Sequence, residues 1–159
     1  MNQTNTIVKM VLDRWNASLA SCDNLLKQLS NEALQKEIAP GRNRGIYLLG
    51  HLVAVHDDML ILLGIGEKDY PELQEPFLKQ PDKAVADLPS AATLRSYWEK
   101  QSAKLHGIFE AMQPGDWFEK HTVVSAEDFA TEPHRNKLNI ILTRTNHLQY
   151  HIGQLILLK

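Results

Sequence analysis

Apolar residues recur at every third or fourth position through most of this chain. The clearest run begins near Thr6 and ends near Leu29 with no Pro or Gly between them. Its members are Val8, Leu12, Trp15, Leu19, Cys22, Leu26 and Leu29. A repeat of about 3.6 residues places such side chains on one face of an α-helix, whereas strands alternate with a period of 2. The same repeat returns in three further segments, at residues 44–63, 91–112 and from 136 to near 159.

Four long amphipathic helices in a chain of 159 residues predict an all-α fold, most simply one four-helix bundle in a single domain, residues 1–159. Residues 121–125 are the one short strand candidate. Two connections are unusually long, residues 65–88 between the second and third helices and residues 113–135 between the third and fourth. Loops of this length usually cover a site or cross the body of a domain. If the first crosses the whole bundle, the second and third helices are parallel.

Composition and charge exclude several classes of function. Lys plus Arg number 17 against 19 Asp plus Glu, and the basic residues form no run, so we expect no nucleic-acid partner. Residues 1–6 lack the features of a signal peptide, and the most apolar stretch, residues 59–65, is too short to span a bilayer. The only cysteine, Cys22, lies on an apolar stripe, which favours a core residue over a catalytic thiol. We therefore expect a cytoplasmic protein with no membrane contact.

Two histidines, His147 and His151, stand four residues apart in the last helix. That spacing puts both imidazoles on one helix face, about 5–6 Å apart. Both fall in the apolar stripe, where Leu or Ile is usual, and His51 lies in the apolar second helix. Three imidazoles of this kind form a site for a divalent metal with open positions. Histidines satisfied by hydrogen bonds at the edge of a core are the alternative interpretation.

The depth of these histidines along their helices agrees with a shared site. His51 lies about eight residues after the start of the second helix, and His151 about eight residues before the end of the fourth. At about 1.5 Å per residue, both lie about 12 Å from those ends. In antiparallel helices the three imidazoles therefore share one level.

Other polar residues near the histidines are weaker candidates. Gln154 shares their helix face and would orient a bound water or substrate, or form an ordinary polar rim. Arg144, one turn before His147, would receive a carboxylate or other anion, or pair with an acidic neighbour. His56, beside two aspartates, is interpreted as a surface residue or a support for the ligands. The remaining histidines have no helical partner histidine; they are His106, His121 and His134.

The chemistry of such a site is the activation of a nucleophile or of an electrophile. Three neutral ligands leave the charge of the ion uncompensated, so a bound water or thiol ionises more easily. The zincin signature His-Glu-x-x-His is absent, because Leu148, Gln149 and Tyr150 separate the two histidines. This counts against a metalloprotease. Imidazole ligands favour Zn or Ni as the ion found after isolation.

Two motifs resemble those of the DinB-like superfamily of damage-inducible-type proteins. They are Leu48–Val53, which reads LLGHLV, and His147–Leu155, which reads HLQYHIGQL. The resemblance implies an up-down-down-up four-helix bundle, frequent homodimers and a metal triad at His51, His147 and His151. Similar proteins include bacillithiol S-transferases and mycothiol-dependent maleylpyruvate isomerases, in which a metal activates a low-molecular-weight thiol. Others are described only as metal-dependent hydrolases. The resemblance does not imply DNA binding.

The leading functional hypothesis is therefore a metal-dependent enzyme that transfers a low-molecular-weight thiol to a small electrophile. The alternatives are a hydrolase using metal-bound hydroxide and a non-catalytic, metal-stapled dimeric scaffold. A fourth protein ligand would favour the scaffold, and an open site would favour catalysis. The apolar stripes of the first and third helices are broader than one packing face requires. The additional residues predict a homodimer interface or burial under the long loops; they are Val11, Leu25, Tyr97 and Phe109.

Overall fold

The structure, a computed structural model, describes residues 2–159. Within this range the chain is helical and contains no strand, so the predicted all-α class is confirmed. The long helices are α1 (Gln3–Gln28), α3 (Gly45–Leu62), α4 (Ala91–Ala111) and α6 (Lys137–Leu155). The short elements are α2 (Asn31–Leu34), η1 (Pro71–Leu73), the π-helical turn η2 (Glu75–Lys79), η3 (Asp116–Phe118), α5 (Ala126–Thr131) and η4 (Ile156–Leu158).

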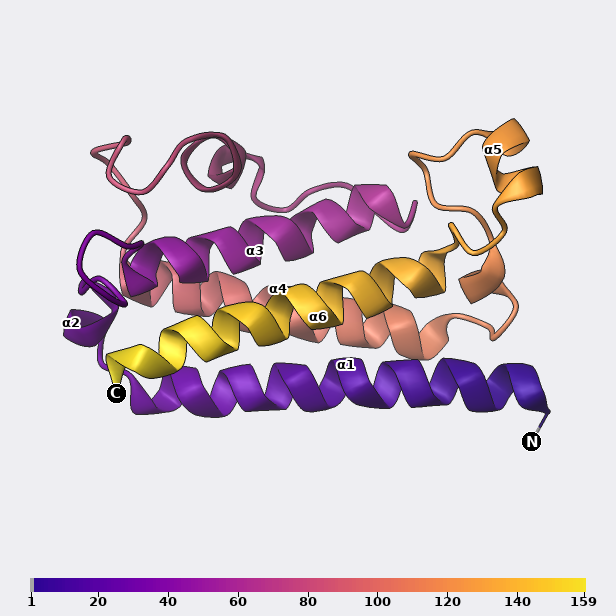
Figure 1. The fold of residues 1–159 in the computed structure, drawn as a ribbon, viewed down its shortest axis with the longest axis horizontal. Helices are drawn as coiled ribbons and strands as arrows, with labels where there is room; N and C mark the ends of the chain where they lie inside the picture. Colours follow the sequence, from indigo (N-terminus) through magenta and orange to yellow (C-terminus); the bar gives the residue numbers. More distant parts are fainter. Residues whose placement is uncertain (1) are drawn as a thin grey trace.

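The four long helices lie side by side along the longest axis of the molecule (Figure 1). In that view α1 and α6 run from right to left, whereas α3 and α4 run from left to right. The closest helix pairs are α1 with α6 and α3 with α4. Since α3 and α6 run in opposite directions, a residue early in α3 and one late in α6 lie near the same end of the bundle.

Three of the long helices begin at side-chain caps. Asn136 accepts a hydrogen bond from the Asn139 backbone N–H at 3.0 Å, and Ser90 does the same for Thr93 at 3.0 Å. Asn2 accepts from Asn5 at 2.9 Å. Each cap satisfies one of the backbone donors that the first turn of a helix leaves free. The polar residues just before the apolar stripes therefore fix where these helices start.

Residues 63–90, here called the strap, return along α3 to the start of α4 (Figure 1). Asp57 of α3 is fully buried and accepts hydrogen bonds from the backbone N–H groups of Asp69 and Tyr70, both at 2.9 Å. Near the other end of α3, the guanidinium of Arg44 forms an ion pair with Asp82 at 2.7 Å. The strap is therefore fastened to α3 near both ends of the helix.

The strand candidate at residues 121–125 is wrong. Thr122 instead donates its backbone N–H to the Leu62 carbonyl at 3.0 Å and its hydroxyl to the carbonyls of Ile61 and Leu62, both at 3.1 Å. The last carbonyls of a helix have no partner within the helix. The segment forms a turn that satisfies the last carbonyls of α3 instead of pairing as a strand.

Helix α3 is covered on almost every side, with 13 of its 18 residues buried. Among the described residues, α3 is also the one helix that is long and apolar enough to cross a membrane. The apolar segment is therefore longer than residues 59–65, the stretch expected from sequence. Burial of 72% of α3 inside the protein is what a central core helix shows. Its wrapping by α4, α6 and the strap explains its unusual apolarity.

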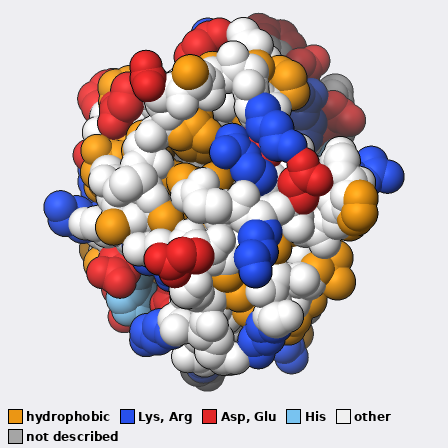
Figure 2. All heavy atoms as spheres, turned by 90° about the vertical axis from the view of Figure 1, so that its left-hand side faces the viewer, with side chains coloured by type: hydrophobic (Ala, Val, Ile, Leu, Met, Phe, Trp, Pro, Cys, Tyr) orange, Lys and Arg blue, Asp and Glu red, His pale blue; other side chains and the backbone are white. Residues whose placement is uncertain are grey.

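The end of the bundle at the left of Figure 1 is shown as a surface in Figure 2. Lys and Arg side chains alternate there with Asp and Glu, and hydrophobic side chains are scattered between them. Mixed charges of this kind are an ordinary solvated surface.

Candidate metal centre

Helices α3 and α6 bring His51, His147 and His151 together. The Nε2 atom of His147 lies 3.1 Å from Nε2 of His51 and 3.1 Å from Nε2 of His151. One nitrogen from each histidine lies within 4.8 Å of the others. Two nitrogens bound to one ion at about 2.0–2.1 Å are separated by roughly 3.0–3.4 Å, so the observed spacing suits a common ion.

Two of the three imidazoles are held by partners on their other nitrogen. Nδ1 of His51 lies 2.9 Å from the carbonyl oxygen of Phe77, and Nδ1 of His151 lies 2.6 Å from Oε1 of Gln154. Both oxygens only accept, so each Nδ1 carries the proton and each Nε2 presents a lone pair to the cluster. Outer partners of this kind fix the tautomer of metal-binding histidines.

Gln154 contacts one of the three histidines directly. Its carbonyl binds His151, and its amide N–H donates to the hydroxyl of Tyr150 at 3.2 Å. Both ends of the amide are therefore engaged in this structure, and the contact with His151 orients that imidazole. A role toward a bound water or substrate stays a prediction.

The cluster needs a positive charge at its centre. If Nε2 of His147 carries a proton, it can donate to Nε2 of only one of the other two histidines, and the second lone pair stays unsatisfied. If Nε2 of His147 carries no proton, three nitrogen lone pairs point at one another. In either case the Nδ1 atom of His147 is buried without a hydrogen-bond partner. Facing lone pairs in a buried site are unfavourable, whereas a cation between them satisfies all three. The residues present therefore fit a divalent ion.

Burial keeps these imidazoles neutral, the form that binds metals. For His147 burial is the largest cause, and the charges of the other two histidines and of Arg144 add to it, bringing its pKa to about 4. Burial also lowers the pKa of His51 and His151, although their Nδ1 hydrogen bonds oppose the shift. At neutral pH no proton competes strongly with an ion for the Nε2 lone pairs.

Gly50 gives Phe77 the room to reach His51. A Cβ atom at Gly50 would overlap the ring of Phe77, which is fully buried against α3. The ring of Tyr47 packs beside it, with centroids 5.8 Å apart, and the Tyr47 hydroxyl donates to the Gln80 carbonyl at 2.8 Å. A side chain at residue 50 would therefore push away the backbone whose carbonyl holds His51.

We expect Gly50→Ala to lower metal affinity by about 10- to 100-fold, the usual cost of disturbing an outer partner of a ligand. The same change should cost about 1–3 kcal/mol of unfolding free energy, because it overpacks the core. Competition with a fluorescent chelator and urea unfolding measure the two effects.

Gly153→Ala is the matched control for this substitution. Gly153 is also a helical glycine next to a ligand, two residues after His151, but no atom lies within 4 Å of the position that a Cβ would take there. It should leave metal affinity unchanged and stabilise the helix by up to about 1 kcal/mol. Equal losses of affinity in both variants would contradict the role given to Phe77.

Arg144 lies on α6, one turn before His147, and forms no ion pair with the residues described. Its Nε atom is buried without a hydrogen-bond partner. It lines a cavity of about 280 Å³. The other lining residues are Asp58, Ile61, Leu62, Lys68, Thr122 and Val123. The acidic pairing that is one alternative for Arg144 is thus not made in this structure.

The interpretation of His56 as a surface or supporting residue is wrong. The side chain is fully buried between Trp15 and Trp98, with ring centroids 5.0 Å away in both cases. Neither ring nitrogen has a hydrogen-bond partner. Burial, with smaller contributions from the charges of His147, Arg144 and His51, lowers the pKa of His56 to about 3.

The remaining candidates take ordinary positions. Cys22 is buried, and burial followed by the charge of Asp23 raises its pKa to about 12, so the thiol stays protonated as a core residue. His106 and His134 are exposed, and neither they nor His121 joins the histidine cluster among the described residues.

The residues suggested for a dimer interface lie inside the chain. Val11, Leu25 and Phe109 are buried in the core. Tyr97 is half-buried and stacks on Tyr70 of the strap, with ring centroids 3.9 Å apart. Burial under the long loops, the other explanation, is correct for Phe109, which packs on Trp117, and for Tyr97, whereas Val11 and Leu25 belong to the hydrophobic core. The homodimer itself stays a prediction without an assigned interface.

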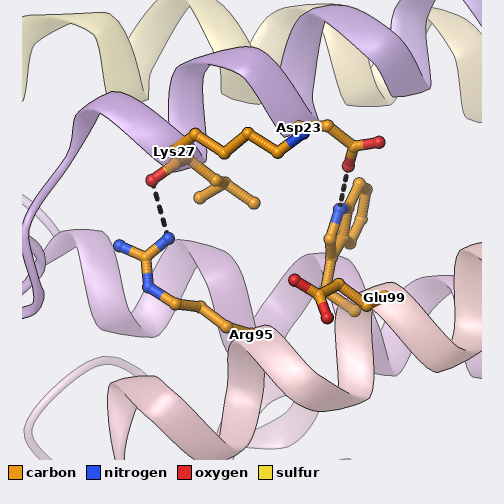
Figure 3. A pocket seen from close by; sticks show the side chains of 6 residues that line it. Asp23, Lys27, Arg95 and Glu99 are labelled. Atoms are coloured by element: carbon orange, nitrogen blue, oxygen red, sulfur yellow. Dashed lines mark hydrogen bonds between the residues drawn. The ribbon is translucent and has the colours of Figure 1, made fainter.

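A separate cavity of about 210 Å³ lies between α1 and α4 (Figure 3). The guanidinium of Arg95 donates to the carbonyls of Leu26 at 2.7 Å and Leu29 at 2.6 Å, and the indole N–H of Trp98 donates to Asp23 at 2.6 Å. The two Arg95 contacts satisfy backbone carbonyls at the C-terminal end of α1, whereas Trp98 binds the Asp23 carboxylate. These hydrogen bonds join α1 to α4, so Arg95, Trp98 and Asp23 in the cavity wall already have partners within the protein.

The fold and the cluster together define the class of protein: an all-helical chain with three converging histidines of the kind that hold a divalent ion. The chain belongs to the DinB superfamily, whose family model matches residues 13–155. The resemblance seen in the sequence motifs is therefore confirmed.

A solved structure shares the fold. The crystal structure of a conserved protein from Enterococcus faecalis aligns with a TM-score of 0.64 at 14% sequence identity. The alignment covers 98% of this chain and 94% of that one. A search of curated proteins found no match.

Proposed function

We propose that this up-down-down-up four-helix bundle binds one divalent ion through His51, His147 and His151 and is a metal-dependent enzyme. Its reaction is the transfer of a low-molecular-weight thiol to a small electrophile. The observation that carries the proposal is the convergence of three Nε2 atoms, two of which have their lone pairs directed inward by partners on Nδ1. Bound there, the ion supplies Lewis-acid activation of a thiol or a water.

An open site supports catalysis over a purely structural ion. Among the described residues the cluster contains three histidines and no fourth His, Cys, Asp or Glu. Structural zinc sites in proteins are almost always closed by four protein ligands, whereas catalytic sites keep a position free. The protein's own contribution is to hold the imidazoles neutral and oriented.

Metal content and thiol chemistry test the proposal together. Purified protein should contain close to one divalent ion per chain, with Zn or Ni expected after isolation. With a haloalkyl dye as electrophile, the thiolate sulfur forms a C–S bond, halide leaves with the bonding electrons, and the thiol proton goes to solvent. A panel of low-molecular-weight thiols, including bacillithiol and mycothiol, should give thioether at a rate that chelation abolishes.

Other outcomes identify the alternatives. Hydrolysis of an ester without any thiol, again abolished by chelation, would replace transfer by hydrolysis. Stoichiometric metal with neither reaction would favour a scaffold. Protein that contains no metal and takes up no added Zn would contradict the site itself. Light scattering at tens of micromolar protein tests the proposed homodimer in the same samples.

A further inference from the structure

Arg144 is a half-buried cation whose charge is not neutralised by a direct partner. The nearest acidic influence is Asp58, which lies too far away for an ion pair. Asp58 is already engaged by Lys68 at 2.6 Å and by the side-chain N–H of Gln74 at 2.8 Å. Burial lowers the pKa of Arg144 and Asp58 opposes this, but a guanidinium stays protonated at neutral pH. A half-buried charge of this kind favours an anion.

The proposed ion makes the excess of positive charge larger. Arg144 precedes His147 by three residues and His151 by seven, so all three side chains project from one side of α6. Neutral imidazoles do not offset the charge of a divalent ion, and Arg144 adds one more. Within the cavity itself, Arg144 and Lys68 face only Asp58, which leaves one net positive charge.

The shape of the cavity restricts the anion. Its volume of about 280 Å³ suits a small molecule, and its apolar wall consists of Ile61, Leu62 and Val123. The hydroxyl of Thr122 is used by the carbonyls at the end of α3, so Arg144 is the one unpaired polar side chain among the lining residues. A planar guanidinium binds a carboxylate through two parallel hydrogen bonds.

We propose that the cavity is the subsite for the substrate and that it takes a short-chain carboxylate, with the carboxylate on Arg144 and the chain on the apolar wall. This inference rests on the proposed function, because it assigns a carboxylate group, used for recognition only, to the small electrophile of that reaction. Arg144 binds the carboxylate one turn of α6 before His147, and none of the three histidines lines the cavity itself.

Butanoate is the probe, with acetate and butanamide as comparisons, in calorimetric titrations of metal-loaded protein. Butanoate should bind more tightly than acetate, which lacks the chain, and than butanamide, which lacks the charge. Arg144→Gln should weaken butanoate binding by at least about tenfold, the effect of losing hydrogen bonds to a charged group. Arg144→Lys, which keeps the charge but not the two-pronged geometry, should lose less.

Lys68→Gln is the matched control, because it removes the same charge from the same cavity but from a side chain already paired with Asp58. It should change butanoate affinity by less than about threefold. Equal losses in Lys68→Gln and Arg144→Gln would overturn the inference, since the effect would then be general electrostatics.

Metal content separates this inference from the proposed function. Binding of butanoate that is unchanged in Arg144→Gln, but absent from the metal-free His147→Ala variant, would place the carboxylate on the ion and overturn the Arg144 subsite. Arg144-dependent binding in protein that takes up no metal would support the subsite while contradicting the proposed enzyme. Circular dichroism of each variant verifies that the helices are intact.

Discussion

His147→Ala should lower Zn affinity by on the order of a hundredfold or more, because a direct ligand contributes more than the outer partners, whose loss already costs 10- to 100-fold. Nε2 of His147 lies 3.1 Å from the nitrogens of both other histidines, so its removal leaves a two-imidazole site. His51→Ala and His151→Ala should have the same effect. Competition with a chelator of known affinity measures it, with elemental analysis of the purified variants as a second readout.

His106→Ala is the control for these variants. His106 is exposed on α4 and lies outside the cluster, so its loss should leave metal binding intact. All four variants should keep their helical circular dichroism, since the core is built mainly from aliphatic and aromatic side chains. A loss in His106→Ala equal to that in His151→Ala would disprove the ligand assignment. Unfolding on chelation alone would make the ion structural.

Stability should fall steeply in acid because of His56. Its pKa is about 3 in the folded protein, below the ordinary value of 6.5 that it has when the chain is unfolded. Between these two values the unfolded chain binds a proton that the folded chain excludes, so stability decreases as the pH falls from about 6.5 towards 3 and is unaffected above that range. One such proton changes the unfolding free energy by about 1.4 kcal/mol per pH unit.

His56→Leu should remove this contribution. We expect the difference in unfolding free energy between His56→Leu and the wild type to grow in favour of the variant as the pH is lowered from about 7.5 to about 5. Urea unfolding of both proteins is measured with the same chelator present, so that the other histidines titrate alike in both. The difference between the two pH dependences is then the contribution of His56 to the unfolding free energy. Parallel pH dependences would show that the buried ring does not resist protonation.

The four long helices and the histidine cluster were predictable because both depend on periodicity. A four-residue spacing fixes His147 and His151 on one helix face regardless of the rest of the fold, and the depth of His51 requires only that α3 and α6 run in opposite directions. The length of the connection before α4 also predicted that α3 and α4 are parallel, because it is long enough to return along the whole of α3.

Burial of polar residues on α3 was not predictable in the same way. Asp57 and Asp58 suggest a solvent-facing side beside His56, but the strap covers that side and uses Asp57 to bind its own backbone. A helix covered all round has no polar face to detect. Phe77 was missed for a related reason: its contribution is a backbone carbonyl, and Gly50 is the only sign of its approach in the sequence.

The sequence did not decide whether the additional apolar residues of α1 and α4 form a dimer interface or are buried under the long loops. Phe109 packs against Trp117 of the second long connection, with ring centroids 5.1 Å apart, and Tyr97 stacks on the strap. Loops that bury aromatic rings widen an apolar stripe just as a partner chain does. Periodicity alone does not distinguish the two causes.

The two supports of the histidine cluster have different tolerance to mutation. Gln154 holds His151 through a side-chain amide, so a single codon change removes that support. His51 is held by the main-chain carbonyl of Phe77, a group that every amino acid carries. The strap can therefore diverge in sequence and still orient His51, provided that residue 50 remains small and the strap keeps its path. Over evolutionary time the more durable half of the site is the half built from backbone.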